Sequence, residues 1–141
     1  MRKAAGFIVF RKKSNKIQYL LLQALYRKRH WSPPKGHVDF GETDMDAAYR
    51  ETKEEAGLLK DDLTIYRECL SVLNYVRGGE DKEVMLWLAE LKNVEKEIII
   101  SREHDRYEWC DLESACEHAY HREVLQNAFR NCHTFIQNNL L

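Results

Sequence analysis

Three glutamates, Glu51, Glu54 and Glu55, have the types and spacing that could do chemistry. Glu54 and Glu55 follow Glu51 by three and four positions, so all three lie on one face of a helix. Like charges at this spacing repel each other by about 0.2–0.5 kcal/mol per pair in an exposed helix. Mg²⁺ would relieve this repulsion, because it binds one or two carboxylates together with phosphate oxygens. A solvated helix carries the same residues, so the spacing alone leaves both interpretations open.

The glutamates belong to a longer pattern, which reads Gly36-x5-Glu42-x7-Arg50-Glu51-Thr52-x-Glu54-Glu55-x-Gly57-Leu58. Chance agreement at this many fixed positions is very improbable. The segment resembles the Nudix box, which implies a loop–helix–loop that binds divalent metal, Mg²⁺ or alternatively Mn²⁺, and positions a pyrophosphate. In that family the residues corresponding to Glu51, Glu54 and Glu55 ligate metal. Thr52 stands where the family prefers an aliphatic residue, and its methyl group can still pack.

The resemblance extends over nearly the whole chain to the animal-type asymmetrical diadenosine tetraphosphate hydrolases of the Nudix family. The matching segments are His30–Asp39, Asn74–Val76, Leu86–Ala89 and Glu103-His104. Two departures are Phe40, where a proline is usual, and Arg29, where a second histidine often stands. The resemblance implies cleavage of diadenosine tetraphosphate to ATP and AMP. Alternatives are a Nudix hydrolase acting on RNA ends or diphosphoinositol phosphates, and a non-catalytic binding module, which would be expected to lose its box carboxylates.

A four-phosphate substrate also needs cations and stacking surfaces. Cations cluster before the box, at Arg27, Lys28, Arg29, His30, Lys35 and His37. A solvated basic loop is the alternative, but the acidic face beside it favours phosphate binding. The resemblance adds Lys82 as a phosphate contact, and it places Tyr75 and Tyr120 where the subfamily sandwiches a purine. Without that resemblance, aromatic residues in such elements would be assigned to the core.

The mechanism expected is in-line attack of water on phosphorus, with metal generating the nucleophile. Lys35, His30 and Lys82 would hold phosphate oxygens, with His37 beside them. Glu55 is the preferred general base and Glu103 the second choice. Glu103 resembles a carboxylate that the family brings to the metal from outside the box, although a surface turn would explain it equally well. Arg50 could orient a carboxylate through two parallel hydrogen bonds.

The elements that must position these residues alternate between strands and helices, which predicts an α/β fold: a Nudix-type α/β/α sandwich with a mixed sheet. Strands are expected at 3–10, 17–25, 63–76 (as one long strand or two short ones), 83–91, 97–100 and 107–109, with a hairpin turn at 77–81 and a loop at 26–41. Helices are expected from Thr43 to about Ala56, with Gly57 as the stop, from Asp111 through Ala119, and from about His121 to Asn138.

The chain has 141 residues, which fits one domain spanning 1–141. Its net charge of −1 provides no basic field, so no stable nucleic-acid partner is expected. Apolar runs are too short to span a membrane. Four cysteines without a C-x-x-C pair indicate free thiols in a reducing compartment, the cytoplasm or alternatively the nucleus. A monomer is the default expectation, with a small dinucleoside polyphosphate as the partner.

Overall fold

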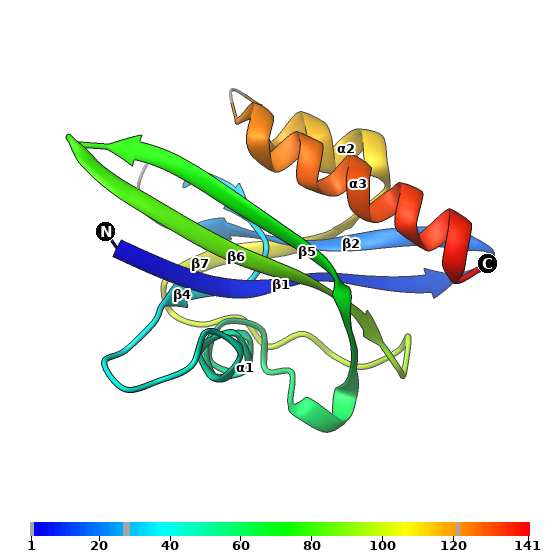
Figure 1. Ribbon diagram of the computed structural model, residues 1–141. Helices are drawn as coiled ribbons and strands as arrows, with labels where there is room; N and C mark the ends of the chain where they lie inside the picture. Colours follow the sequence, from blue (N-terminus) through cyan, green and yellow to red (C-terminus); the bar gives the residue numbers. More distant parts are fainter. Residues whose placement is uncertain (1, 27–28, 121) are drawn as a thin grey trace.

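The computed structural model describes residues 2–26, 29–120 and 122–141 (Figure 1). The strands are β1 (Arg2–Lys13), β2 (Lys16–Ala24), β3 (Trp31–Ser32), β4 (Lys35–His37), β5 (Leu63–Arg77), β6 (Glu80–Leu91) and β7 (His104–Cys110). The helices are α1 (Asp44–Ala56), the 3-10 turn η2 (Lys60–Asp62), α2 (Leu112–His118) and α3 (Glu123–Asn139).

The strands form one mixed sheet in the order β3-β2-β1-β6-β5, with β4 paired to β1 and β7 paired to β2. Only the β1–β6 pairing is parallel among the described residues; it runs from Arg2 opposite Lys82 to Phe10 opposite Glu90. The β5–β6 hairpin turns at Gly78 and Gly79, whose φ angles of 59° and 77° suit glycine. The mixed sheet confirms the fold class predicted from the sequence.

Both faces of the sheet are buried, because helices cover both (Figure 1). Helix α1 lies on one face, while α2 and α3 lie on the other. Side chains of β1 alternate between the two cores: Ile8 and Phe10 pack on the α3 side, and Phe7 and Val9 pack on the α1 side. This alternation across a doubly covered sheet gives the α/β/α sandwich that the pattern of elements predicts.

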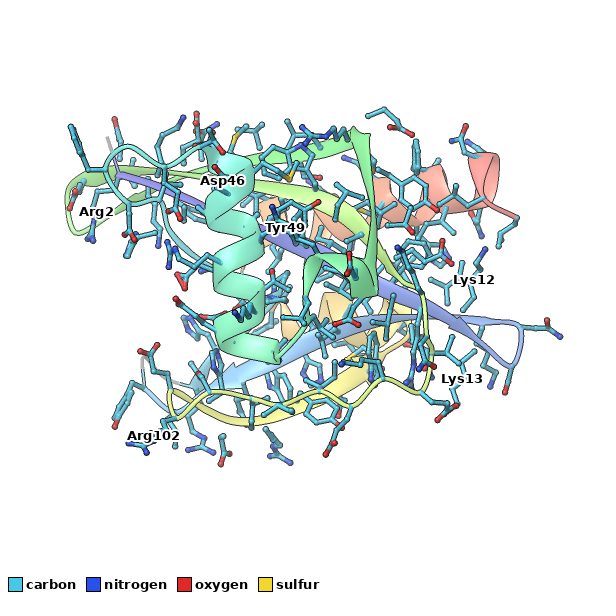
Figure 2. The ribbon with its side chains drawn as sticks, turned by 90° about the horizontal axis from the view of Figure 1, so that it is seen from below. Arg2, Lys12, Lys13, Asp46, Tyr49 and Arg102 are labelled. Carbon is cyan, nitrogen blue, oxygen red and sulfur yellow. The ribbon has the colours of Figure 1, made fainter. Side chains whose placement is uncertain are left out.

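Helix α1 begins and ends where the sequence indicates. The Thr43 side chain accepts a hydrogen bond from the Asp46 backbone N–H at 3.0 Å, and Gly57 ends the helix in the left-handed region with φ 72°. Buried alanines and Thr52 face the sheet, so the acidic residues are left on the opposite side and along one flank. In Figure 2, seen from below, α1 lies across the sheet, with Tyr49 on the side where the Lys60 ammonium lies 4.8 Å from its ring.

Two local predictions are wrong. Residues 26–41 are not entirely loop, because β3 and β4 pair with β2 and β1 within this stretch. Residues 97–100 are not a strand: the Ile99 N–H donates to the Ala56 carbonyl at 3.0 Å, which satisfies a carbonyl at the end of α1 instead of a sheet neighbour. The last helix begins at Glu123, and the predicted start at His121 lies outside the described residues.

Within the described ranges, no helix is both long enough and apolar enough to cross a membrane. All four cysteines are free thiols. Cys69 and Cys132 are the nearest pair, with their sulfur atoms 3.9 Å apart in the core between β5 and α3.

Candidate active site

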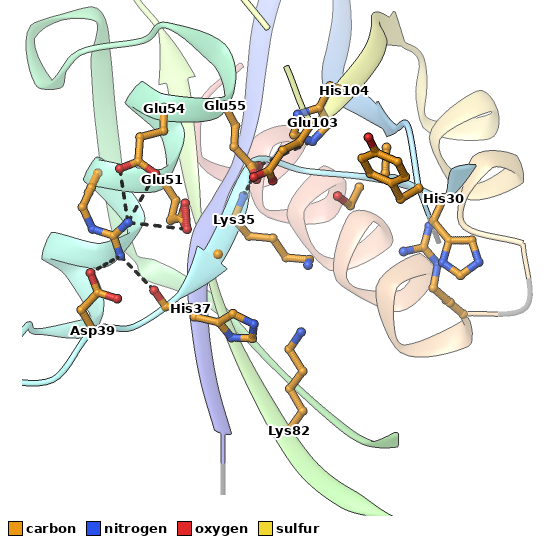
Figure 3. Close-up of a pocket in the computed structure, with 16 residues that line it drawn as sticks. His30, Lys35, His37, Asp39, Glu51, Glu54, Glu55, Lys82, Glu103 and His104 are labelled. Carbon is orange, nitrogen blue, oxygen red and sulfur yellow. Dashed lines mark hydrogen bonds and ion pairs between the residues drawn. The ribbon is translucent and has the colours of Figure 1, made fainter. Parts of the chain in front are cut away.

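A pocket of about 660 Å³ opens beside α1 and the end of the sheet (Figure 3). Its lining residues come from segments far apart in the sequence, including β4, α1, β6 and the start of β7. They are Ala24, Tyr26, His30, Ser32, Lys35, Gly36, His37, Asp39, Arg50, Glu51, Glu54, Glu55, Lys82, Glu103, His104 and Arg122. Acidic side chains therefore share one pocket with several cations.

Glu55 lies in the last turn of α1, with its side chain 16% exposed. Its Oε1 accepts a hydrogen bond from the Lys35 backbone N–H at 3.0 Å, and His104 Nε2 lies 4.0 Å away. Burial raises the pKa of Glu55 to about 7, and the charge of Glu103 adds to this, against the opposing hydrogen bond and charge of Lys35. A carboxyl group with a pKa near neutral can both hold and release a proton at physiological pH.

Glu51 is packed against the backbone of β4. A Cβ atom at Gly36 would come within 1.5 Å of the Glu51 Oε2, so only glycine leaves room for this carboxylate. Burial raises the pKa of Glu51 to about 8, and the neighbouring Glu54 and Glu55 carboxylates raise it further while Arg50 opposes them. The neighbouring carboxylates therefore add to the effect of burial at Glu51, in the direction that the sequence predicts.

Glu103 reaches the pocket from the segment before β7, and it is held there by its backbone. Its carbonyl accepts from the Leu25 N–H at 2.9 Å, and its N–H donates to the Ser101 hydroxyl at 3.2 Å. In Figure 3 its carboxylate points toward that of Glu55. The same hydroxyl lies 2.8 Å from His104 Nδ1, so one serine positions both residues.

Arg50 organises the other side of α1. Its Nε and one terminal nitrogen pair with the two Glu42 oxygens at 2.8 and 2.9 Å, and that terminal nitrogen also donates to the His37 carbonyl at 2.9 Å. The other terminal nitrogen lies 3.4 Å from both Glu54 oxygens and 3.7 Å from Glu51. These contacts raise the pKa of Arg50 and hold that of Glu42 at about 2. Arg50 thus links the loop before α1, strand β4 and the acidic face of α1.

The cations lie across the pocket from the carboxylates. Lys35 and His37 come from β4, and Lys82 comes from β6, two strands that both pair with β1. In Figure 3 the Lys35, His37 and Lys82 side chains point into the space below Glu55, and His30 lies to one side. An anion in the pocket would therefore be flanked by positive charge opposite the acidic face.

All nine residues predicted for metal, phosphate and catalytic roles, apart from the two stacking tyrosines, line the pocket. These are His30, Lys35, His37, Arg50, Glu51, Glu54, Glu55, Lys82 and Glu103, and His104 lines the pocket beside them. Tyr75 does not line the described pocket; it packs partly buried against the core on the α3 side, opposite Lys82 in the β5–β6 register. Tyr120 is 70% exposed just after α2.

Tyr26 and Arg122 also line the pocket and were not predicted from the sequence. Arg122 donates to the Trp31 carbonyl, which ties the segment after α2 to β3. Neither residue belongs to a recognisable short motif. In the basic cluster, Arg29 pairs with Asp105 and does not line the pocket, while Arg27 and Lys28 lie outside the described residues.

The sequence is similar to a known protein family and to relatives of known activity. The NUDIX domain model matches residues 1–132. The bis(5'-nucleosyl)-tetraphosphatase [asymmetrical] of Caenorhabditis elegans is 48% identical over 122 residues, which cover 86% of this chain and 88% of that protein. The Mus musculus protein of the same name is 44% identical over 128 residues, covering 86% and 87%.

The fold agrees equally well with a solved relative. The crystal structure of a C. elegans Ap4A hydrolase binary complex superposes with a TM-score of 0.94 at 44% sequence identity. The match covers 98% of this chain and 99% of the other. The pocket therefore lies within a domain whose sequence and fold agree with these relatives almost from end to end.

Proposed function

The chain belongs to the Nudix family, and from that premise we propose that it is a divalent-metal-dependent hydrolase that cleaves diadenosine tetraphosphate asymmetrically, to ATP and AMP. Relatives named asymmetrical bis(5'-nucleosyl)-tetraphosphatases match at 44–48% identity over 86% of the chain. The observation that carries the proposal is the pocket in which the α1 carboxylates face the cations of β4 and β6. This arrangement suits a polyphosphate bound through metal on one side and through lysine and histidine on the other.

The donor set fits a hard divalent cation. Glu51 and Glu55 carry raised pKa values because their carboxyl groups are buried and, to a smaller extent, lie near other carboxylates, so a cation there would stabilise the ionised forms. Glu51, Glu54, Glu55 and Glu103 are the residues that would hold it. We propose Mg²⁺, with Mn²⁺ as the alternative, and when bound it would supply activated water and neutralise charge at the phosphate.

We assign Glu55 as the general base that takes the proton from the attacking water. Its carboxylate lines the pocket beside that of Glu103, where it could accept a proton from water at the metal. The Lys35 N–H fixes one carboxylate oxygen at 3.0 Å, so the other oxygen is left for the proton. Glu103 is the second candidate, since it approaches the same position from another segment of the chain.

The remaining residues bind and orient the substrate. His30, Lys35, His37 and Lys82 would hold phosphate oxygens and stabilise charge that develops on them. Arg50 acts as a positioning residue, because it braces Glu54 and the β4 carbonyl. Tyr75 and Tyr120, which do not line the pocket itself, would stack on an adenine that extends beyond it.

Net charge, cysteine chemistry and the make-up of the site bear on substrate size, cellular compartment and oligomeric state. The weak net charge of −1 supports a small-molecule substrate over a long RNA, whose binding would depend steeply on salt. Four free thiols support a reducing compartment, the cytoplasm or the nucleus. We propose a monomer, since one chain supplies every residue assigned to the site.

Product analysis tests this proposal. The protein is incubated with diadenosine tetraphosphate and excess Mg²⁺, and the nucleotides are separated by ion-exchange chromatography. Equal amounts of ATP and AMP are expected. Two molecules of ADP would contradict the asymmetric placement of the phosphates, and an absence of turnover would overturn the substrate assignment.

A further inference from the structure

A second group of metal-ligating side chains lies outside the active-site pocket, where β7 meets α2. Glu108 and Cys110 belong to β7, and His118 is the last residue of α2. One ligand atom from each residue lies within 4.8 Å of the other two. We propose that Glu108, Cys110 and His118 form a binding site for a borderline divalent cation such as Zn²⁺, independent of the carboxylates of α1.

The local fold brings these ligands together. Glu108 and Cys110 are two residues apart on one strand, so their side chains lie on the same face of the sheet. The Asp111 side chain caps α2 by accepting from the Ser114 N–H at 2.8 Å, so the helix begins immediately after Cys110. The short helix α2 therefore places its last residue, His118, beside Glu108 and Cys110.

The present contacts converge on one oxygen. Glu108 Oε2 lies 3.0 Å from Cys110 Sγ and 2.5 Å from His118 Nε2. A tetrahedral Zn²⁺ with bonds of about 2.0–2.3 Å would separate its ligand atoms by roughly 3.5 Å. The three atoms therefore need to spread by about 1 Å, and Glu108 can do so because its side chain is 48% exposed. A water molecule would complete four-coordination from the open side.

The other two ligands are already positioned. Cys110 is buried in the core, with 2% of its surface exposed. The Trp31 ring stacks on the His118 imidazole at a centroid distance of 4.3 Å and an angle of 23°, which restricts rotation of the ligand ring. Orientation of a ligating histidine by its surroundings is a general feature of protein metal sites.

The ligand chemistry distinguishes this site from the acidic pocket. A thiolate and an imidazole favour Zn²⁺ or Co²⁺, while Mg²⁺ prefers oxygen ligands throughout. Binding would release the thiol proton to solvent. The thiolate and the Glu108 carboxylate then balance the two charges of the ion. Arg106 lies near Glu108 but is not a ligand of the proposed site.

The test is a Co²⁺ titration of the full chain with excess Mg²⁺ present to occupy the carboxylates of α1. Cobalt bound to a thiolate gives an intense near-ultraviolet charge-transfer band, which oxygen ligands do not give. We expect this band in the native protein and in the control Cys116→Ser, whose thiol lies on α2 outside the cluster, and we expect its loss in Cys110→Ser. A native protein without the band, or a band that survives in Cys110→Ser, would overturn the proposal.

A second measurement does not depend on replacing a buried residue. Zn²⁺ affinity is measured by calorimetry in the same Mg²⁺ buffer for the native protein and for His118→Gln. We expect at least tenfold weaker binding in the variant. At 100 times the native dissociation constant, Zn²⁺ should raise the native melting temperature by roughly 5–10 °C and the variant much less. Equal affinities and equal shifts would overturn the proposal.

Discussion

The two sides of α1 place similar carboxylates in opposite electrostatic environments. Glu42, in the loop before the helix, is paired with the Nε and one terminal nitrogen of Arg50, and its pKa is held at about 2. On the pocket side, burial, together with nearby carboxylates, raises the pKa of Glu51 to about 8 and that of Glu55 to about 7. The residues are of one type, so the difference lies entirely in their surroundings.

This difference separates a structural region from a functional one. Paired charges around Arg50 stabilise the loop before α1, and they require no bound ligand to offset them. Crowded charges around Glu55 destabilise the folded chain at neutral pH, and a protein retains such a cost where a ligand relieves it. The comparison therefore supports our proposal that a cation binds on the Glu51–Glu55 side, with the Glu42–Arg50 side as its support.

Replacing the proposed base should have the largest effect. We expect Glu55→Gln to lower kcat by roughly 10³-fold, because the amide cannot accept the proton of the attacking water. Steady-state kinetics with saturating Mg²⁺ would measure this, with the exposed Glu97→Gln as a matched control that leaves kcat unchanged. Near-normal turnover in Glu55→Gln would remove Glu55 from the role and direct attention to Glu103.

The pH dependence of stability should differ in sign between the two regions. Raised pKa values mean that the folded chain binds the protons of Glu51 and Glu55 more tightly than the unfolded chain does. The free energy of unfolding of the metal-free protein should therefore fall by several kcal/mol as pH rises from about 4.5 to 8. Glu42 acts oppositely: its contribution is present above pH 4.5 and is lost as pH falls toward 2.

Urea unfolding in the presence of a chelator, repeated across this pH range, would measure both parts of the profile. These are the fall in stability between about pH 4.5 and 8, the neutral limb, and the fall toward pH 2, the acidic limb. Glu55→Gln should flatten the neutral limb and leave the acidic limb intact. A native protein whose stability is constant between pH 5 and 8 would show that the pocket carboxylates are not crowded as described.

Weakening the support should have a smaller effect. Arg50→Lys removes the two parallel hydrogen bonds to Glu42, which an ammonium group cannot reproduce. We expect the free energy of unfolding to fall by about 1–2 kcal/mol at pH 7, with the acidic limb reduced. The exposed Arg67→Lys on β5 serves as the control, and an Arg50→Lys protein as stable as that control would contradict a structural role for the pair.

The smallest predicted change is a gain. Thr52 is fully buried on the sheet side of α1, and its hydroxyl has no hydrogen-bond partner within the described residues. Thr52→Val keeps the shape and removes the unsatisfied group, so we expect about 1 kcal/mol of added stability and unchanged kcat. Thermal unfolding would measure it, and a lower melting temperature would show that the hydroxyl is satisfied in solution.

The sequence predicted those parts of the molecule whose signals are local. Helix α1 has a cap, an acidic face and a terminal glycine within 15 residues, and the long strands alternate between two buried faces. The box glutamates follow directly from that helix. The β4 cations belong to the basic cluster that precedes the box, and Lys82 on β6 was found through resemblance. The sheet register explains why they meet, since both strands pair with β1.

The parts that the sequence did not predict depend on distant partners. Strands β3 and β4 have two and three residues, too few to show periodicity, and they form only because β2 and β1 offer free edges. Residues 97–100 have strand composition, yet Ile99 bonds to the end of α1. Arg122 enters the pocket through a contact with the Trp31 carbonyl, 91 residues away in the chain.

The most direct test of the account is the number of protons released when Mg²⁺ binds at pH 7. It is measured by titration calorimetry in buffers of different ionisation enthalpy, without substrate. Because Glu51 and Glu55 hold protons at this pH in the metal-free chain, we expect about one proton to be released, and less in Glu55→Gln. Binding without proton release would show that the cation sits elsewhere, and the crowded carboxylates would then need another explanation.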